Sequence, residues 1–191
     1  MTRFDAIGIV CRSLSTEPVV ASLGHPAYEL FAHGDRPLNF YTWGSMGLTS
    51  SIALGIALVR PDRRVVALDG DGSLLMNLGS LATIAASAPA NLVVIVLDNE
   101  QYGTTGGQPT ATAGCADLEA AGRALGLRQT ATVHDTEGLA QVLAETHGTA
   151  GPWLIVAKGT ESTPTVKPPL DCVYIKRRFM DALSACFPPR P

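Results

Sequence analysis

The sequence predicts an α/β fold: a doubly wound, mostly parallel sheet with helices on both faces. Apolar, strand-like runs alternate with helical patterns over short connections, as in parallel strands joined by helices. The run 92–97 is continuously hydrophobic, which is typical of a central strand buried on both faces. Glycine-rich connections follow several strands, at the edge of the sheet where such folds bind ligands.

We expect strands at 18–22, 39–42, 64–68, 92–97, 129–133 and 153–157. Helices are expected at 3–14, 27–33, from the turn at 44–47 to about 60, 74–88, 117–125, 136–145 and about 173–186. A long loop rich in Gly and Thr, 99–114, follows the central strand. These elements form a single domain, 1–191, in which 159–191 are a C-terminal tail with its own helix.

The composition excludes several classes of protein. Hydrophobic residues make up 46% of the chain, which excludes a disordered protein. Fourteen basic residues face 17 acidic ones, so the chain lacks the positive charge of a nucleic-acid-binding domain. Charged residues amount to only 16%, against about 25% in a typical soluble domain. The shortage of charge indicates either a domain that is buried on many faces or a surface that another chain partly covers.

Membrane insertion and export are also not expected. The uncharged runs 37–59 and 74–97 are long enough to span a bilayer, but Asn, Ser and Pro interrupt them, so we interpret them as buried core. The N-terminus lacks the pattern of a signal peptide. The four cysteines lie far apart and indicate neither a zinc nor an iron–sulfur site. We therefore expect a cytoplasmic protein with free thiols.

The strongest local motif is Gly70-Asp71-Gly72-Ser73, between a strand and a helix. One interpretation is a dinucleotide site of the GxGxxG type, with Asp98 as the acid after the next strand. The third glycine is missing, however, because Leu75 stands there. Asp71 would also repel a diphosphate unless a cation lies between them.

A hard divalent cation, Mg²⁺ or Ca²⁺, resolves this conflict because it binds carboxylate, amide and phosphate oxygens together. Asn99 follows the next parallel strand and offers such an amide oxygen. Neighbouring strands lie about 4.8 Å apart, so the two strand ends can share one ion. The sequence thus favours a metal–diphosphate site over a nicotinamide site.

With these motifs the sequence resembles the thiamin-diphosphate enzymes, whose pattern is Gly-Asp-Gly, about 25 residues, then Asn-Asn. Asp98 replaces the first Asn, which leaves its role open between buttressing the loop and contacting the cofactor. Within the family, the chain resembles the β subunits or C-terminal halves of sulfopyruvate and phosphonopyruvate decarboxylases. Matching segments are 35–41, 44–47, 51–58, 70–73, 106–110 and 175–183, so the resemblance covers nearly the whole chain.

The resemblance implies Mg²⁺ bound by Asp71, Asn99 and the main-chain carbonyl of Gln101. It also implies that the Gly44 carbonyl receives the cofactor's 4′-amino group and that Met46 supports its bend, although Met46 alone would suit an ordinary core position. The full set of expected cofactor contacts is Gly24, His25, Gly44, Ser45, Met46, Gly70, Asp71, Gly72, Ser73, Asn99, Gln101, Tyr102 and Gly103. The run 102–110 is expected to form a mobile cover.

Members of this family need a second domain, with a glutamate that activates the aminopyrimidine. No glutamate here has the expected setting, so the resemblance implies an α subunit that supplies it, in a hetero-oligomer such as a heterotetramer or larger. No residue of this chain is expected to be catalytic itself.

The expected substrate is a small anionic 2-oxoacid, decarboxylated to the aldehyde and CO₂. Lys158, Lys167 and Arg177 are candidate contacts to its anion, against the alternatives that each is a solvated surface charge, or that the partner supplies the whole anion pocket. Two alternatives stay open. One is a subunit of another thiamin-diphosphate enzyme, an acyloin synthase or a 2-oxoacid oxidoreductase. The other is a non-catalytic subunit that binds the cofactor only to stabilise its partner.

Overall fold

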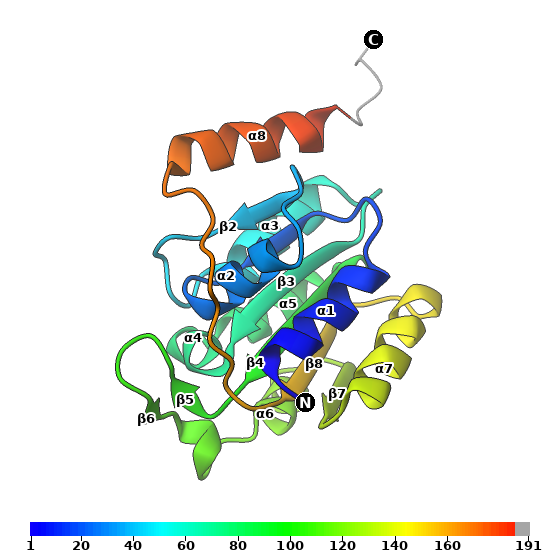
Figure 1. Ribbon diagram of the computed structural model, residues 1–191. Helices are drawn as coiled ribbons and strands as arrows, with labels where there is room; N and C mark the ends of the chain where they lie inside the picture. Colours follow the sequence, from blue (N-terminus) through cyan, green and yellow to red (C-terminus); the bar gives the residue numbers. More distant parts are fainter. Residues whose placement is uncertain (186–191) are drawn as a thin grey trace.

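A computed structural model describes residues 1–185. Its main sheet has six strands in the order β2-β1-β3-β4-β8-β7, and neighbouring strands are paired in parallel. The strands are β1 (Val19–Ala21), β2 (Asn39–Tyr41), β3 (Val65–Gly70), β4 (Leu92–Asp98), β7 (Gln129–Val133) and β8 (Trp153–Lys158). All six predicted strands are present, and the predicted doubly wound fold is confirmed (Figure 1).

Helices cover both faces of this sheet (Figure 1). On one face lie α1 (Arg3–Ser13), α2 (His25–Ala32) and α7 (Thr136–Gly148), whose apolar residues pack with Val66 and Leu68 of β3. On the other lie α3 (Thr49–Val59), α5 (Ser80–Ser87) and α6 (Leu118–Ala124), which pack with Val65 and Ala67. Successive side chains of β3 thus point to opposite faces, and all of residues 65–68 are buried because helices cover both faces, which explains why this run is apolar throughout.

The prediction of one helix over 74–88 was wrong in one respect, because two shorter helices occupy this part of the chain. They are α4 (Asp71–Met76) and α5 (Ser80–Ser87), separated at Asn77 and Gly79. Asn77 directly follows α4, and its side chain donates to the carbonyl of Gly47 at 2.9 Å. Asn and Gly are also weak helix formers. The break thus ties α4 to the 44–47 turn beside the site.

The expected loop 99–114 also contains regular structure. It forms a small antiparallel hairpin, β5 (Gln101–Tyr102) and β6 (Gln108–Pro109), followed by the 3₁₀ helix η1 (Ala111–Ala113). The hairpin lies beside α4 at the carboxyl edge of the sheet (Figure 1).

The C-terminal tail begins with a strap, residues 159–171, which crosses the face formed by α1 and α2 (Figure 1). At its start, Arg3 donates through its main-chain N–H to the carbonyl of Thr160 at 3.0 Å. Near its end, Trp43 Nε1 donates to the carbonyl of Pro169 at 2.8 Å. The strap is therefore held at its start by α1 and near its end by Trp43, which follows β2.

The strap leads to α8 (Cys172–Ser184), which packs on β2. Phe179 of α8 lies against Phe40, with ring centroids 5.3 Å apart, and Arg178 pairs with Asp35. Cys186, at the end of the helix expected from the sequence, lies outside the described residues. Within residues 1–185, none of the helices has the length and apolarity that crossing a membrane requires.

Candidate functional site

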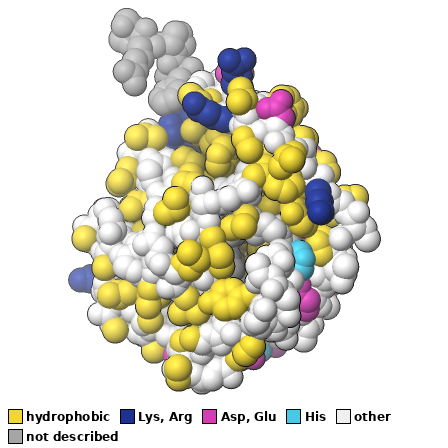
Figure 2. All heavy atoms as spheres, turned by 90° about the vertical axis from the view of Figure 1, so that its left-hand side faces the viewer, with side chains coloured by type: hydrophobic (Ala, Val, Ile, Leu, Met, Phe, Trp, Pro, Cys, Tyr) yellow, Lys and Arg dark blue, Asp and Glu magenta, His cyan; other side chains and the backbone are white. Residues whose placement is uncertain are grey.

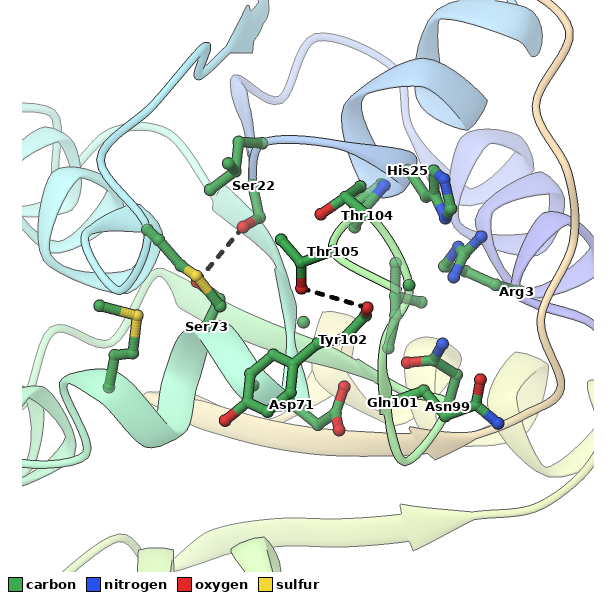
Figure 3. A pocket seen from close by; sticks show the side chains of 18 residues that line it. Arg3, Ser22, His25, Asp71, Ser73, Asn99, Gln101, Tyr102, Thr104 and Thr105 are labelled. Carbon is green, nitrogen blue, oxygen red and sulfur yellow. Dashed lines mark hydrogen bonds between the residues drawn. The ribbon is translucent and has the colours of Figure 1, made fainter. Parts of the chain in front are cut away.

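A cavity of about 350 Å³ opens at the carboxyl edge of the sheet, between α4, the hairpin and α2 (Figure 3). This volume is in the range of small-molecule sites. Its lining includes ten of the thirteen expected contacts: His25, Met46, Gly70, Asp71, Gly72, Ser73, Asn99, Gln101, Tyr102 and Gly103. The expected contacts Gly24, Gly44 and Ser45 do not line it.

Asp71 is the first residue of α4, directly after the end of β3. Its Oδ2 accepts hydrogen bonds from the hydroxyls of Thr110 at 2.5 Å and Thr112 at 3.1 Å. Burial raises the pKa of Asp71, and the charge of Asp98 raises it further, against the lowering effect of the two hydroxyl donors. Two threonines thus hold one oxygen of the carboxylate.

Asp98 ends β4 and is buried, but it does not line the cavity. Its Oδ1 accepts from Thr112 Oγ1 at 2.8 Å and from the main-chain N–H of Glu100 at 3.1 Å. Its Oδ2 lies 3.0 Å from Nζ of Lys158. Asp98 therefore contacts the loop that carries Asn99, and Thr112 connects it to Asp71.

The turn after β4 has an unusual backbone at Glu100, whose φ is +63°. Such a value is uncommon for a residue with a side chain and is often found at functional sites. The turn brings both Asn99 and Gln101 to the cavity (Figure 3). Gln101 lies opposite Pro109 in the hairpin, next to the pair in which the Thr110 N–H donates to the Glu100 carbonyl at 2.9 Å. Because hydrogen-bonded and non-hydrogen-bonded pairs alternate in an antiparallel ladder, the Gln101 carbonyl points away from β6.

The hairpin packs directly on two of the expected glycines. A Cβ on Gly72 would lie 2.3 Å from Cε1 of Tyr102, and one on Gly24 would lie 2.7 Å from Cγ2 of Thr104. Gly24 also has a φ of +76°. These glycines are therefore required for the hairpin to approach α4 and α2, and the expectation that it is a mobile cover stays a prediction.

The 44–47 turn lies beside the cavity, and a hydrogen bond to Ser73 of α4 holds it in place. Ser45 has a φ of +60°, and the main-chain N–H of Gly47 donates to Oγ of Ser73 at 2.9 Å. Ser22 Oγ lies 3.3 Å from the same Ser73 oxygen. The Ser73 hydroxyl thus supports the turn, and Met46 is the residue of this turn that lines the cavity.

Two residues at the site were missed by sequence reasoning. Arg3 lines the cavity, and Glu161 of the strap accepts hydrogen bonds from Arg3 and contacts His25 Nδ1 at 2.6 Å. Burial opposes ionisation of Glu161, but Arg3 and His25 outweigh it and lower its pKa. Arg3 lies in an ordinary amphipathic helix and Glu161 in a loop rich in Pro and Thr, so no local motif marks either one.

The three basic residues considered as contacts to a substrate anion lie outside the lining of the cavity. Lys158 pairs with Asp98 and with Glu100, the latter at 2.7 Å. Lys167 Nζ lies 5.2 Å from the centroid of the Tyr28 ring, and Arg177 is exposed on α8. None of them lines the cavity in the described part of the chain.

The donors at the cavity fit a hard cation. Within residues 1–185, no three His, Cys, Asp or Glu side chains converge on one point, so a soft-metal site of the zinc type is not formed there. Asp71 supplies a carboxylate, Asn99 an amide and Gln101 a main-chain carbonyl, which are oxygen ligands of the kind that Mg²⁺ and Ca²⁺ take. These three ligands fill only part of the coordination shell of such an ion, and diphosphate oxygens and water are suited to fill the remaining positions.

Several proteins are similar to this chain in sequence. The chain is 40% identical over 186 residues to sulfopyruvate decarboxylase subunit beta of Methanococcus maripaludis, an alignment that covers 96% of this chain and 98% of that protein. It is 50% identical over 139 residues to sulfopyruvate decarboxylase of Methanosarcina acetivorans, where it covers 73% of this chain but spans only 36% of the relative. It is 44% identical over 137 residues to phosphonopyruvate decarboxylase of Streptomyces viridochromogenes, covering 72% of this chain and 34% of that protein.

A solved structure has a similar fold. The thiamine diphosphate-dependent 4-hydroxybenzoylformate decarboxylase of Rhodococcus jostii superposes with a TM-score of 0.71 at 20% identity, over 85% of this chain and 33% of that one. Residues 25–157, from the start of α2 to within β8, match the family described as thiamine pyrophosphate enzyme, C-terminal TPP binding domain. This chain therefore belongs to the thiamine pyrophosphate (thiamin diphosphate) enzymes and carries their C-terminal cofactor-binding domain.

Proposed function

We propose that this chain is the β subunit of a two-chain, thiamin-diphosphate- and Mg²⁺-dependent decarboxylase. The proposed substrate is 3-sulfopyruvate or 3-phosphonopyruvate, which is converted to the aldehyde and CO₂. One observation carries the proposal: the alignment to a protein named as a β subunit covers 96% of this chain and 98% of that subunit. The relatives of greater length carry the names of the same two decarboxylases.

The residues at the cavity suit the two ends of this cofactor differently. Asp71, Asn99 and the Gln101 carbonyl are proposed to hold Mg²⁺, while main-chain groups of Gly72 and Ser73 bind the diphosphate. Gly44 and Met46 belong to the turn that Ser73 fixes, which favours a role in orienting the other end of the cofactor. When bound, thiamin diphosphate supplies the electron sink for the charge left by loss of CO₂.

A partner subunit is proposed because the cavity lacks the carboxylate that activation of the aminopyrimidine requires. Among the described residues that line it, Asp71 is the one carboxylate, and it belongs to the metal end. The surface near the cavity is also apolar, since Met76 of α4 is 64% exposed and Leu48 is 44% exposed. Figure 2 shows many hydrophobic and few charged side chains on this face. An exposed apolar surface of this kind favours coverage by another chain.

The substrate's sulfonate or phosphonate is proposed to contact mainly the partner. Arg3 and His25 are the basic side chains that line the described cavity, and Glu161 contacts both. They are therefore not free to neutralise a second anion. The assembly is proposed to be an α/β hetero-oligomer, a heterotetramer or larger, in the cytoplasm, where Cys11, Cys115 and Cys172 would stay reduced.

The proposal is tested by measuring CO₂ release from each of the two 2-oxoacids, with thiamin diphosphate and Mg²⁺ present. This chain, the product of the neighbouring gene and their mixture are assayed in parallel. We expect release from the mixture alone, and loss of release when Asp71→Ala replaces the wild-type chain. Turnover by this chain without a partner would contradict the two-chain assignment, and an inactive mixture that still binds the cofactor would favour a non-catalytic subunit.

A further inference from the structure

The carboxylate of Glu161 lies among three donors at the metal end of the cavity. Its Oε2 accepts from Arg3 Nη1 at 3.0 Å and from Nδ2 of Asn99. Its Oε1 accepts from Arg3 Nη2 at 3.1 Å and lies 2.6 Å from His25 Nδ1. Both oxygens are thus engaged by residues from three separate elements, α1, α2 and the turn after β4.

A buried scaffold holds this carboxylate in place. Arg3 is 6% exposed, and its Nε and Nη2 donate to the two oxygens of fully buried Glu29 at 3.0 and 2.8 Å. Arg3 Nη2 also donates to the carbonyl of Ser162 at 2.8 Å. Paired donors of this kind fix geometry as well as charge. The position of Glu161 is therefore set by α1 and α2 rather than by the strap alone.

The contact to Asn99 determines which way its amide faces. An amide carries its oxygen and its NH₂ group on opposite branches, and only the oxygen can bind a hard cation. Because Nδ2 donates to Glu161, the oxygen branch is directed away from the strap. We propose that Glu161 is a positioning residue, which orients Asn99 so that Oδ1 and not the NH₂ group is presented to the metal. The inference rests on the proposed function and deepens it.

A different role for Glu161 would have the opposite consequence. Its carboxylate pairs with Arg3 and contacts His25, so it could instead compete with the diphosphate for these two side chains. If Glu161 competes, its removal strengthens cofactor binding. If it orients Asn99, its removal weakens metal binding, since partners of metal ligands typically contribute about 10- to 100-fold in affinity.

The experiment uses the complex of this chain with the neighbouring gene product and takes Mn²⁺ as the probe. Free Mn²⁺ is counted by electron paramagnetic resonance at saturating thiamin diphosphate. For Glu161→Gln and Glu161→Ala we expect Mn²⁺ affinity to fall about 10- to 100-fold. Thr163→Ala, an exposed change two residues along the strap, is the matched control and should leave affinity unchanged.

A paired substitution separates orientation from folding. Asn99→Asp alone places two carboxylates in contact and should weaken Mn²⁺ binding. In Asn99→Asp with Glu161→Gln, the glutamine NH₂ donates to the aspartate, so affinity should return to within a few-fold of the wild type. Melting temperatures of the metal-free complexes show which variants are folded.

Two results would overturn the inference. One is a Glu161→Gln or Glu161→Ala complex that binds Mn²⁺ as tightly as the wild type or more tightly. The other is a double variant with no recovery over Asn99→Asp. A wild-type complex that binds neither Mn²⁺ nor thiamin diphosphate is a distinct outcome, because it contradicts the proposed function itself and the inference with it.

Discussion

Lys158 Nζ lies 3.0 Å from Oδ2 of Asp98, across the carboxyl ends of the neighbouring strands β8 and β4. Asp98 is the residue at which this sequence departs from the Asn-Asn pattern, and Lys158 pairs with it. An aspartate in place of the first asparagine adds a buried negative charge next to Asp71, and Lys158 supplies the compensating positive one. Burial lowers the pKa of Lys158, but hydrogen bonds to Glu100 and Asp98 outweigh it and raise that pKa.

Replacing the cation should destabilise the protein. Lys158→Met leaves Asp98 buried without a partner charge, and we expect the free energy of unfolding to fall by about 2 kcal/mol. Asp98→Asn in the same chain should recover most of this loss, because the family's neutral residue needs no cation. Urea denaturation of the single and double variants measures both effects, with exposed Lys176→Met as the control. Equal losses in Lys158→Met and the double variant would contradict the pairing.

The hydroxyl of Thr112 should matter for the cofactor. It contacts Asp71 and Asp98 at 3.1 and 2.8 Å, and Thr112→Val removes the group that both carboxylates share. We expect a loss of about 1.4 kcal/mol, or roughly tenfold, in Mg²⁺-dependent affinity for thiamin diphosphate. Thr112→Ser keeps the hydroxyl and should stay close to the wild type. Calorimetric titration distinguishes the two, and similar affinities for valine and serine would count against this role.

A methyl group on Gly72 should disturb the hairpin. The added Cβ would lie 2.3 Å from the Tyr102 ring, so Gly72→Ala should displace β5 and lower cofactor affinity at least tenfold. Gly55 on α3 has open space around its Cβ position, and Gly55→Ala should stabilise the protein by up to about 1 kcal/mol. The two alanine variants are compared by calorimetry and thermal melting. Normal binding by Gly72→Ala would show that the hairpin does not need this contact.

The alkaline limb of the stability curve should report on Tyr41. Burial raises the pKa of Tyr41 above its ordinary value, while the hydrogen bond from the Asn39 amide lowers it. Asp35, which accepts a hydrogen bond from the Tyr41 hydroxyl, raises the pKa further. The folded state therefore keeps this proton where the unfolded chain releases it. Stability from Tyr41 is complete below pH about 10 and is lost as pH rises above that value, by up to about 1.4 kcal/mol per pH unit.

Tyr41→Phe removes this titrating group. The variant should be less stable than the wild type at neutral pH by about 1 kcal/mol, because two hydrogen bonds of the hydroxyl are lost. Above pH about 10 its stability should fall less steeply than that of the wild type. Urea midpoints from pH 8 to 11 test this, and parallel alkaline limbs would be inconsistent with a raised pKa at Tyr41.

The sheet and the metal end of the site were predictable because their information is local. Short runs rich in apolar or β-branched residues mark the six strands. Asp71 and Asn99 each follow a strand directly, so the parallel topology alone brings them together. The break at Asn77 was not predictable from the apolar pattern. It depends on a hydrogen bond to Gly47, 30 residues earlier in the chain.

The rest of the site depends on contacts between distant segments. Glu161 meets Arg3 from the far end of the sequence, and neither residue lies in a motif. Thr110 and Thr112 lie in a Thr-rich loop. Nothing in that sequence distinguishes a threonine whose hydroxyl donates to Asp71 from one whose hydroxyl faces water. Such residues become visible only when the hairpin and the strap are folded onto the edge of the sheet.

Native mass spectrometry of the complex between this chain and the neighbouring gene product tests the proposed function most directly. We expect the wild-type complex to carry thiamin diphosphate with a divalent cation, and the Asp71→Ala complex to carry neither. A complex that retains a nicotinamide dinucleotide, or a wild-type complex that binds no thiamin diphosphate when the cofactor and Mg²⁺ are supplied, would contradict the assignment.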